Sequence, residues 1–97
     1  MNLLLTKTIN QLKSNYPNFE EDLQKEIIKQ EISLKLIQLR LESGLTQSVF
    51  AQQLGLKQTQ LSRFESGTGN PTIFTLQKIA KRTGYDLDIS FKKINEY

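Results

Sequence analysis

Residues 46–67 read TQSVFAQQLGLKQTQLSRFESG, and this stretch decides the fold of the chain. It contains two short helical segments, 47–54 and about 58–66, separated by a turn at Gly55. Ala51 lies four residues before Gly55, and Leu61 lies six residues after it. Helices that meet across so tight a turn need a small residue at their contact, a glycine that accepts positive φ and an apolar anchor on the second helix. The spacing therefore predicts two short helices packed against each other across the glycine, a helix-turn-helix.

The second helical segment exposes side chains that can donate hydrogen bonds to DNA. They are Lys57, Gln58, Thr59, Gln60, Ser62 and Arg63, and no acidic residue occurs among them before Glu65. Glutamine can form two hydrogen bonds with adenine, and arginine can do so with guanine. Apolar residues of the same stretch are expected to supply the buried contacts: Val49, Phe50, Leu54, Leu56, Leu61 and Phe64. The pattern favours a DNA-reading helix, with a purely structural use of the same fold as the alternative.

Residues 36–84 resemble the Cro/CI-type helix-turn-helix family, also called the XRE family. The matching positions are Leu36, Leu39, Arg40, Gly44, Leu45, Thr46, Gln47, Ala51, Leu54, Gly55, Leu61, Ser62, Arg63, Glu65, Gly67, Pro71, Leu76, Ile79, Ala80 and Gly84. The resemblance implies that Gln47 holds a phosphate, that Gln58, Thr59 and Arg63 face bases, and that Lys57 and Gln60 lie at the edge. It also implies an internal salt bridge between Arg40 and Glu65. Lys57 departs from the family where a Ser or Thr cap is usual, and Val49 replaces the usual Glu of the capping box.

Length and composition limit the other possibilities. The chain has 97 residues, which is enough for one domain, and it contains neither cysteine nor histidine. Disulfide scaffolds, Cys/His zinc sites and histidine-based catalysis are therefore excluded. We expect a cytoplasmic binding protein with no catalytic residue, no metal and no cofactor, and the apolar run at 3–5 is too short for a membrane span.

The positive charge lies in the second half of the chain. Residues 1–44 carry six basic and six acidic side chains, whereas residues 45–97 carry seven basic and four acidic ones. The whole net charge of +3 therefore belongs to the half that contains the helix-turn-helix. Such asymmetry is expected when one part of a protein faces nucleic acid.

Capping residues, helix breakers and the hydrophobic period predict the remaining elements. We expect a first helix over 1–16, a second from near Phe19 to 42, kinked or continuous, and a fifth over 73–83. Residues 86–92 alternate apolar and polar side chains, which predicts a β-strand. The expected fold is therefore mainly α, a five-helix Cro/CI-like (lambda repressor-like) domain. It spans 32–84, with an N-terminal helical extension at 1–31 and a C-terminal strand or tail at 85–97.

The second helix should carry two apolar stripes on nearly opposite faces. Ile28, Ile32, Leu36 and Leu39 form one, which should pack on the core; Ile27, Leu34, Ile37 and Leu41 form the other. The second stripe must meet either the N-terminal segment 3–12 or another protein. Residues 18–31 also carry five carboxylates against two lysines, as in a solvated helix face or an acidic arm that grips a basic protein. The strand, unable to complete its ladder alone, should pair with a symmetry mate, a partner's sheet edge or a strand near 3–9.

An acidic helical arm, a two-sided helix, a DNA-binding module and a terminal strand are together similar to the layout of HigA-type antitoxins. This resemblance implies a protein that neutralises a HigB/RelE-like mRNA-cleaving toxin and represses its own operon, as a homodimer or as a heterotetramer with the toxin. The partner-binding residues would be Phe19, Leu23, Ile27, Leu34, Ile37, Leu41, Leu87, Ile89 and Phe91. The alternatives are a stand-alone phage-type repressor, a purely protein-binding neutraliser and, last, an enzyme.

Overall fold

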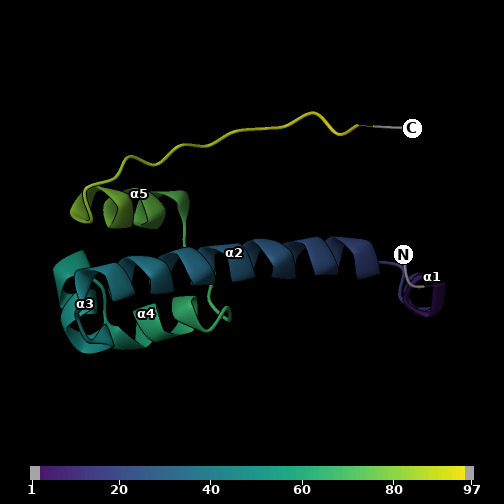
Figure 1. Cartoon of the computed structure of the whole chain (residues 1–97), viewed down its shortest axis with the longest axis horizontal. Helices are drawn as coiled ribbons and strands as arrows, with labels where there is room; N and C mark the ends of the chain where they lie inside the picture. The colour runs from purple at the N-terminus through teal and green to yellow at the C-terminus, as the bar shows by residue number, and fades with distance from the viewer. Residues whose placement is uncertain (1–2, 96–97) are drawn as a thin grey trace.

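The computed structural model describes residues 3–95, and in these residues the fold is mainly α (Figure 1). Its helices are α1 (Leu3–Asn15), α2 (Phe19–Ser43), α3 (Gln47–Leu54), α4 (Gln58–Glu65) and α5 (Ile73–Arg82). The expected five-helix organisation is confirmed, with boundaries within two residues of the predicted ones. The ends of the predicted extension and tail, residues 1, 2, 96 and 97, lie outside the described residues. None of the helices within residues 3–95 is both long and apolar enough to cross a membrane.

Local capping rules set the ends of the short helices. The Thr46 hydroxyl accepts a hydrogen bond from the backbone N–H of Val49 at 3.3 Å, and the Thr72 hydroxyl accepts one from Thr75 at 3.1 Å. These bonds satisfy backbone donors that the first turn of a helix leaves unpaired. Gly55 ends α3 at φ +71°, a conformation that other residues adopt only with strain. The turn between α3 and α4 therefore forms as the sequence predicts.

The core lies between the C-terminal half of α2 and the three short helices. Its fully buried side chains are Phe50, Leu54 and Leu61, joined by Leu36, Ala51, Phe64 and Ile79. Ile32, Leu39, Leu45 and Leu56 pack around them, partly buried. Val49, by contrast, is about half exposed, so its predicted burial is wrong. It lies in the first turn of α3, on the side away from the core.

Helix α2 is continuous over 25 residues, and its N-terminal half extends beyond the helix-turn-helix (Figure 1). Of the predicted inner stripe, Leu36 is buried and Ile32 and Leu39 are partly buried, but Ile28 is exposed because no core lies opposite it. Helix α1 lies across the far end of α2, where Lys13 and Glu20 form an ion pair. It does not cover the outer stripe: Leu34 and Leu41 remain 65% and 68% exposed.

The predicted C-terminal β-strand is wrong. Residues 85–95 are extended, but none of the described residues 3–95 belongs to a strand. The alternating pattern of 86–92 favours an extended backbone, yet a strand also needs a neighbour for its N–H and C=O groups. The intramolecular neighbour considered at 3–9 is helical, as part of α1. The segment instead runs back along the side of the molecule that carries α5 (Figure 1).

Candidate nucleic-acid interface

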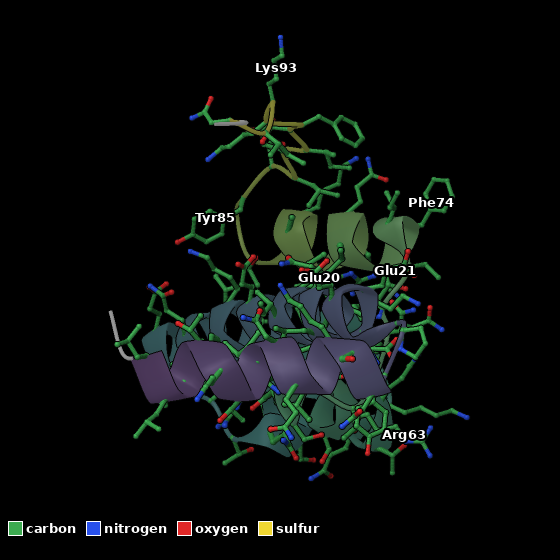
Figure 2. The ribbon with its side chains drawn as sticks, turned by 90° about the vertical axis from the view of Figure 1, so that its right-hand side faces the viewer. Glu20, Glu21, Arg63, Phe74, Tyr85 and Lys93 are labelled. Atoms are coloured by element: carbon green, nitrogen blue, oxygen red, sulfur yellow. The ribbon has the colours of Figure 1, made fainter. Side chains whose placement is uncertain are left out.

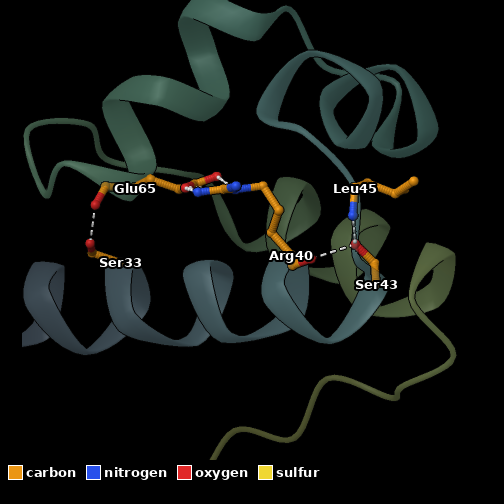
Figure 3. Close-up of polar contacts among 5 residues, drawn as sticks. All are labelled: Ser33, Arg40, Ser43, Leu45 and Glu65. Carbon is orange, nitrogen blue, oxygen red and sulfur yellow. Dashed lines mark hydrogen bonds and ion pairs between the residues drawn. The ribbon is translucent and has the colours of Figure 1, made fainter.

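Helix α4 is held against α2 through Glu65, the last residue of α4 (Figure 3). The Arg40 Nη2 lies 2.9 Å from Glu65 Oε1, and Arg40 Nε donates to both carboxylate oxygens at 3.0 and 3.1 Å. This bidentate pair is the internal salt bridge that the family resemblance implies, and it is mostly buried. The hydroxyl of buried Ser33 also donates to the main-chain oxygen of Glu65. One end of α4 is therefore fixed to α2 through both its side chain and its backbone.

The opposite side of the helix-turn-helix is fixed by two cations of α5 that the sequence analysis did not single out. Lys78 Nζ donates to the main-chain oxygen of Gly55 at 3.0 Å, and Arg82 Nη1 donates to that of Gln53 at 3.2 Å. Both acceptors lie at the C-terminal end of α3, where carbonyls are unpaired and the helix dipole favours cations. Only the spacing of Lys78 and Arg82, one helical turn apart, signals that they act together.

These two anchors leave one polar face of α3 and α4 open to solvent. A shallow hollow of about 420 Å³ on this face is lined by Gln47, Gln58, Thr59, Ser62 and Arg63. Gln47 comes from the first turn of α3 and the other four from α4. Five of the seven predicted DNA-binding residues therefore lie together, although α3 and α4 are separate elements. Lys57 and Gln60 are exposed outside the hollow.

The face has the chemistry of a hydrogen-bonding surface. Its five lining side chains carry amide, hydroxyl and guanidinium donors and no carboxylate. Arg63 points outward from the side of the molecule opposite the C-terminal segment (Figure 2). Glu65, the nearest acid in sequence, is turned inward and paired with Arg40. Nothing on this face therefore repels an incoming phosphate.

The predicted partner-binding residues fall on two other surfaces. Leu23, Ile27, Leu34 and Leu41 are exposed on α2, where Phe19 and Ile37 are partly buried. Leu87, Ile89 and Phe91 lie on the C-terminal segment that follows α5, and all three are exposed. The stripe on α2 and the C-terminal segment are thus distinct candidate contact surfaces.

The fold and the polar face together define a helix-turn-helix protein of the DNA-binding class. A family model described as HTH_3, helix-turn-helix, matches residues 36–89, more than half of the chain, so the chain belongs to this family. It is similar over 58 residues, at 40% identity, to the HTH-type transcriptional activator BcrR of Enterococcus faecalis; the match covers 60% of this chain and 28% of BcrR. It is also 44% identical over 46 residues to the HTH-type transcriptional regulator y4dJ of Sinorhizobium fredii (strain NBRC 101917 / NGR234), with 47% of this chain and 60% of that protein covered.

A solved structure agrees with this assignment. The crystal structure of an HTH_3 family transcriptional regulator from Vibrio cholerae has a TM-score of 0.60 and 34% sequence identity to this chain. The likeness covers 64% of this chain and 35% of that one. The chain thus spans between 28% and 60% of the length of these three relatives. The family match over residues 36–89 includes all of α3, α4 and α5.

Proposed function

We propose that this protein represses transcription by binding an operator through α4, and that it also neutralises a toxin through α2. The observation that carries the first part is the convergence of Gln47, Gln58, Thr59, Ser62 and Arg63 on one open hollow. In this proposal Gln58, Thr59 and Arg63 contact base edges in the major groove. Gln47 and Ser62 contact the phosphate backbone, and Lys57 and Gln60 contact the edge of the site.

Base contacts can be tested by truncating single side chains. Arg63→Ala and Gln58→Ala should each weaken operator binding and relax base preference by about 1–3 kcal/mol at the contacted position. Gln52→Ala is the matched control, because Gln52 is an exposed glutamine of α3 outside the hollow. An operator selected from a random DNA pool, together with single-base variants of it, gives the affinity and the base preference of each protein when binding is measured by fluorescence anisotropy. Wild-type binding by both hollow variants would contradict the proposal and leave a helix-turn-helix used only as a scaffold.

Phosphate contacts have a different signature. Lys57→Ala should weaken binding to all sequences alike and reduce the magnitude of the slope of log K against log salt by about 0.9, because one phosphate is no longer neutralised. Repression should further require a dimer that presents two α4 helices about 34–36 Å apart, the spacing of successive major grooves. A monomer that footprints both halves of a palindrome at nanomolar concentration would contradict the dimer.

The second part of the proposal concerns the outer stripe of α2, formed by Ile27, Leu34, Ile37 and Leu41. No residue of this stripe lines the hollow on α3 and α4, and Leu34 and Leu41 are mostly exposed. The preceding residues 18–31 carry a net charge of −3. An apolar stripe continued by an acidic arm suits a small basic protein with an apolar patch. The layout is similar to that of HigA-type antitoxins, so we propose a HigB/RelE-like mRNA-cleaving toxin as the partner, in a homodimer or heterotetramer in the cytoplasm.

The antitoxin role predicts a toxin gene beside this one. A neighbouring reading frame of about 100 residues with a basic product supports it, and the two products should then co-purify. Leu34→Lys with Leu41→Lys should abolish that complex and leave operator binding intact. Phe74→Lys, a change of an even more exposed apolar residue on α5, should leave both the complex and operator binding intact. A complex that withstands Leu34→Lys with Leu41→Lys would contradict toxin binding by the outer stripe of α2. The absence of a toxin gene beside this one would favour a stand-alone phage-type repressor.

A further inference from the structure

We propose that two copies of this chain exchange the part of the C-terminal segment beyond residue 88, so that residues 89–95 of each copy lie in a groove of the other copy between α2 and α5. This inference deepens the dimer of the proposed function by naming its surface. It concerns the side of the molecule that carries α5, and not the hollow on α3 and α4.

The groove has an apolar floor and a charged rim. Its floor is formed by Ile32, Leu36 and Leu39 of α2 together with Leu76 and Ile79 of α5. It encloses about 630 Å³, and residues 85–88 close its outer side. Leu36 and Ile79 are part of the core, so the groove opens directly onto packed side chains. A rigid apolar floor of this size can take several side chains of an extended segment.

The C-terminal segment carries exposed apolar side chains that can pack on such a floor. Beyond residue 88 it exposes Ile89, Phe91 and Ile94, and Phe91 is 98% exposed. At the start of this segment, the N–H of Tyr85 donates a hydrogen bond to the main-chain oxygen of Ala80 at 2.8 Å, which joins the segment to the end of α5. Three large apolar side chains held in water by an extended backbone are costly, and burying them in a groove removes that cost.

The charge of the groove rim favours binding of this basic segment over binding of an acidic segment. The rim of the groove carries Glu31, Glu42, Asp86 and Asp88 against a single cation, Lys35. The segment carries Lys92 and Lys93 beside Phe91. Entry of the segment would therefore pair two lysines with the rim carboxylates while Phe91 reaches the floor.

The arrangement of one chain points to exchange between two copies. Residues 85–88 already line the outer side of the groove, and the segment then runs along α2 away from it (Figure 1). Residue 91 follows only three positions later, so its side chain cannot turn back into the same groove without reversing the chain. Each copy thus has one free segment and one open groove, and a twofold exchange fills both. Arg63 lies on the opposite side of the molecule, so the exchange leaves α4 open (Figure 2).

Reversing the charges tests the groove without touching its floor. Lys92→Glu with Lys93→Glu, and separately Glu31→Lys with Glu42→Lys, should each weaken the homodimer by about tenfold or more, because the segment and the rim then repel. A mixture of the two variants should recover wild-type dimerisation, because each segment again meets a rim of opposite charge. Lys7→Glu with Lys25→Glu, a matched double reversal outside the groove, should change nothing. Sedimentation equilibrium in the absence of DNA and toxin measures all four, and circular dichroism confirms folding.

Two outcomes would overturn the inference, and the first of them leaves the dimer of the proposed function standing. A dimer that survives both reversals would assign dimerisation to another surface, whereas a wild-type monomer at all concentrations would remove the dimer altogether. Operator binding by wild type and by Arg63→Ala is scored separately, so its loss bears on the proposed function alone.

Disulfide cross-linking distinguishes a segment that lies in the groove of a second copy from one that lies in the groove of its own chain. Because the chain has no native cysteine, only the introduced cysteines can form a disulfide. A chain with Ser90→Cys should form a disulfide with a second chain carrying Gln38→Cys on the groove rim, giving a covalent dimer on a non-reducing gel. Gln24→Cys, on α2 outside the groove, should not capture Ser90→Cys. Equal capture by both positions, or only intrachain bridges in a chain that carries Ser90→Cys and Gln38→Cys together, would overturn the exchange.

Discussion

Glu65 joins α4, the helix proposed to contact DNA, to α2. Its carboxylate is almost fully buried and has Arg40 as its charged partner, while its main-chain oxygen accepts from Ser33 (Figure 3). A buried carboxylate is tolerated only when it is paired, because the surrounding protein solvates charge poorly. The single acid at the end of α4 therefore serves packing and leaves the open face free of negative charge.

Removing Arg40 alone should be far more damaging than removing the pair. Arg40→Met leaves the Glu65 carboxylate buried without its partner, at a cost of about 3 kcal/mol in the free energy of unfolding. Arg40→Met with Glu65→Leu removes both charges and should recover most of that loss. Urea denaturation of wild type, both single variants and the double variant completes the cycle. A double variant as unstable as the sum of the singles would show that the two residues are not coupled.

At the scale of elements, α3 and α4 are equal in length but unequal in capping. Thr46 caps α3 through its hydroxyl, whereas Lys57 holds the N-cap position of α4 in an extended conformation without a side-chain cap bond. Lysine has no acceptor with which to bond the first backbone N–H groups of α4. The departure from the family pattern thus leaves α4 stabilised mainly by its buried residues Leu61, Phe64 and Glu65.

Restoring a cap should stabilise the protein. Lys57 already has φ −72° and ψ 145°, so Lys57→Ser needs no backbone change and should raise the free energy of unfolding by about 1 kcal/mol. Lys57→Ala, which removes the same side chain without adding an acceptor, is the control and should give no such gain. Thermal and urea unfolding measure both, and equal stability of the two variants would contradict the argument.

At the scale of the whole molecule, the chain divides into a packed end and a projecting end. The buried residues of the core cluster lie between Leu36 and Ile79, whereas α1 contains no buried residue. The long axis of the described chain is 46 Å, and α2 spans most of it between the two ends (Figure 1). Stability therefore comes mainly from the end of α2 that packs on the core.

Deletion of residues 1–16 should leave the fold intact. Since no side chain of α1 is fully buried and the ion pair of Lys13 with Glu20 is exposed, the free energy of unfolding should change by less than about 0.5 kcal/mol. Urea unfolding followed by circular dichroism measures this change. A loss of several kcal/mol would mean that α1 packs on the domain more closely than its exposure indicates.

Local rules made α3, the turn and the cap of α5 predictable from the residues alone. Thr46, Gly55 and Thr72 act on backbone groups within four residues of themselves, so their effect can be predicted from neighbouring residues in the sequence. The same is true of the inner stripe of α2, apart from Ile28, because helical period alone brings its residues to one face. The predicted burial of Ile28 is wrong because an apolar stripe on a helix does not show where the core of the protein ends.

Sequence by itself therefore determined the helices, the polar face of α4 and membership of the helix-turn-helix class, because these depend on neighbours along the chain. Only the tertiary structure decided that residues 86–92 form no strand, that Lys78 and Arg82 hold the end of α3, and that Gln47 joins the hollow of α4. Each of those facts depends on what lies opposite a residue in space. Contacts between segments that are distant in the sequence produce no periodic pattern of residues, so they cannot be predicted from the sequence.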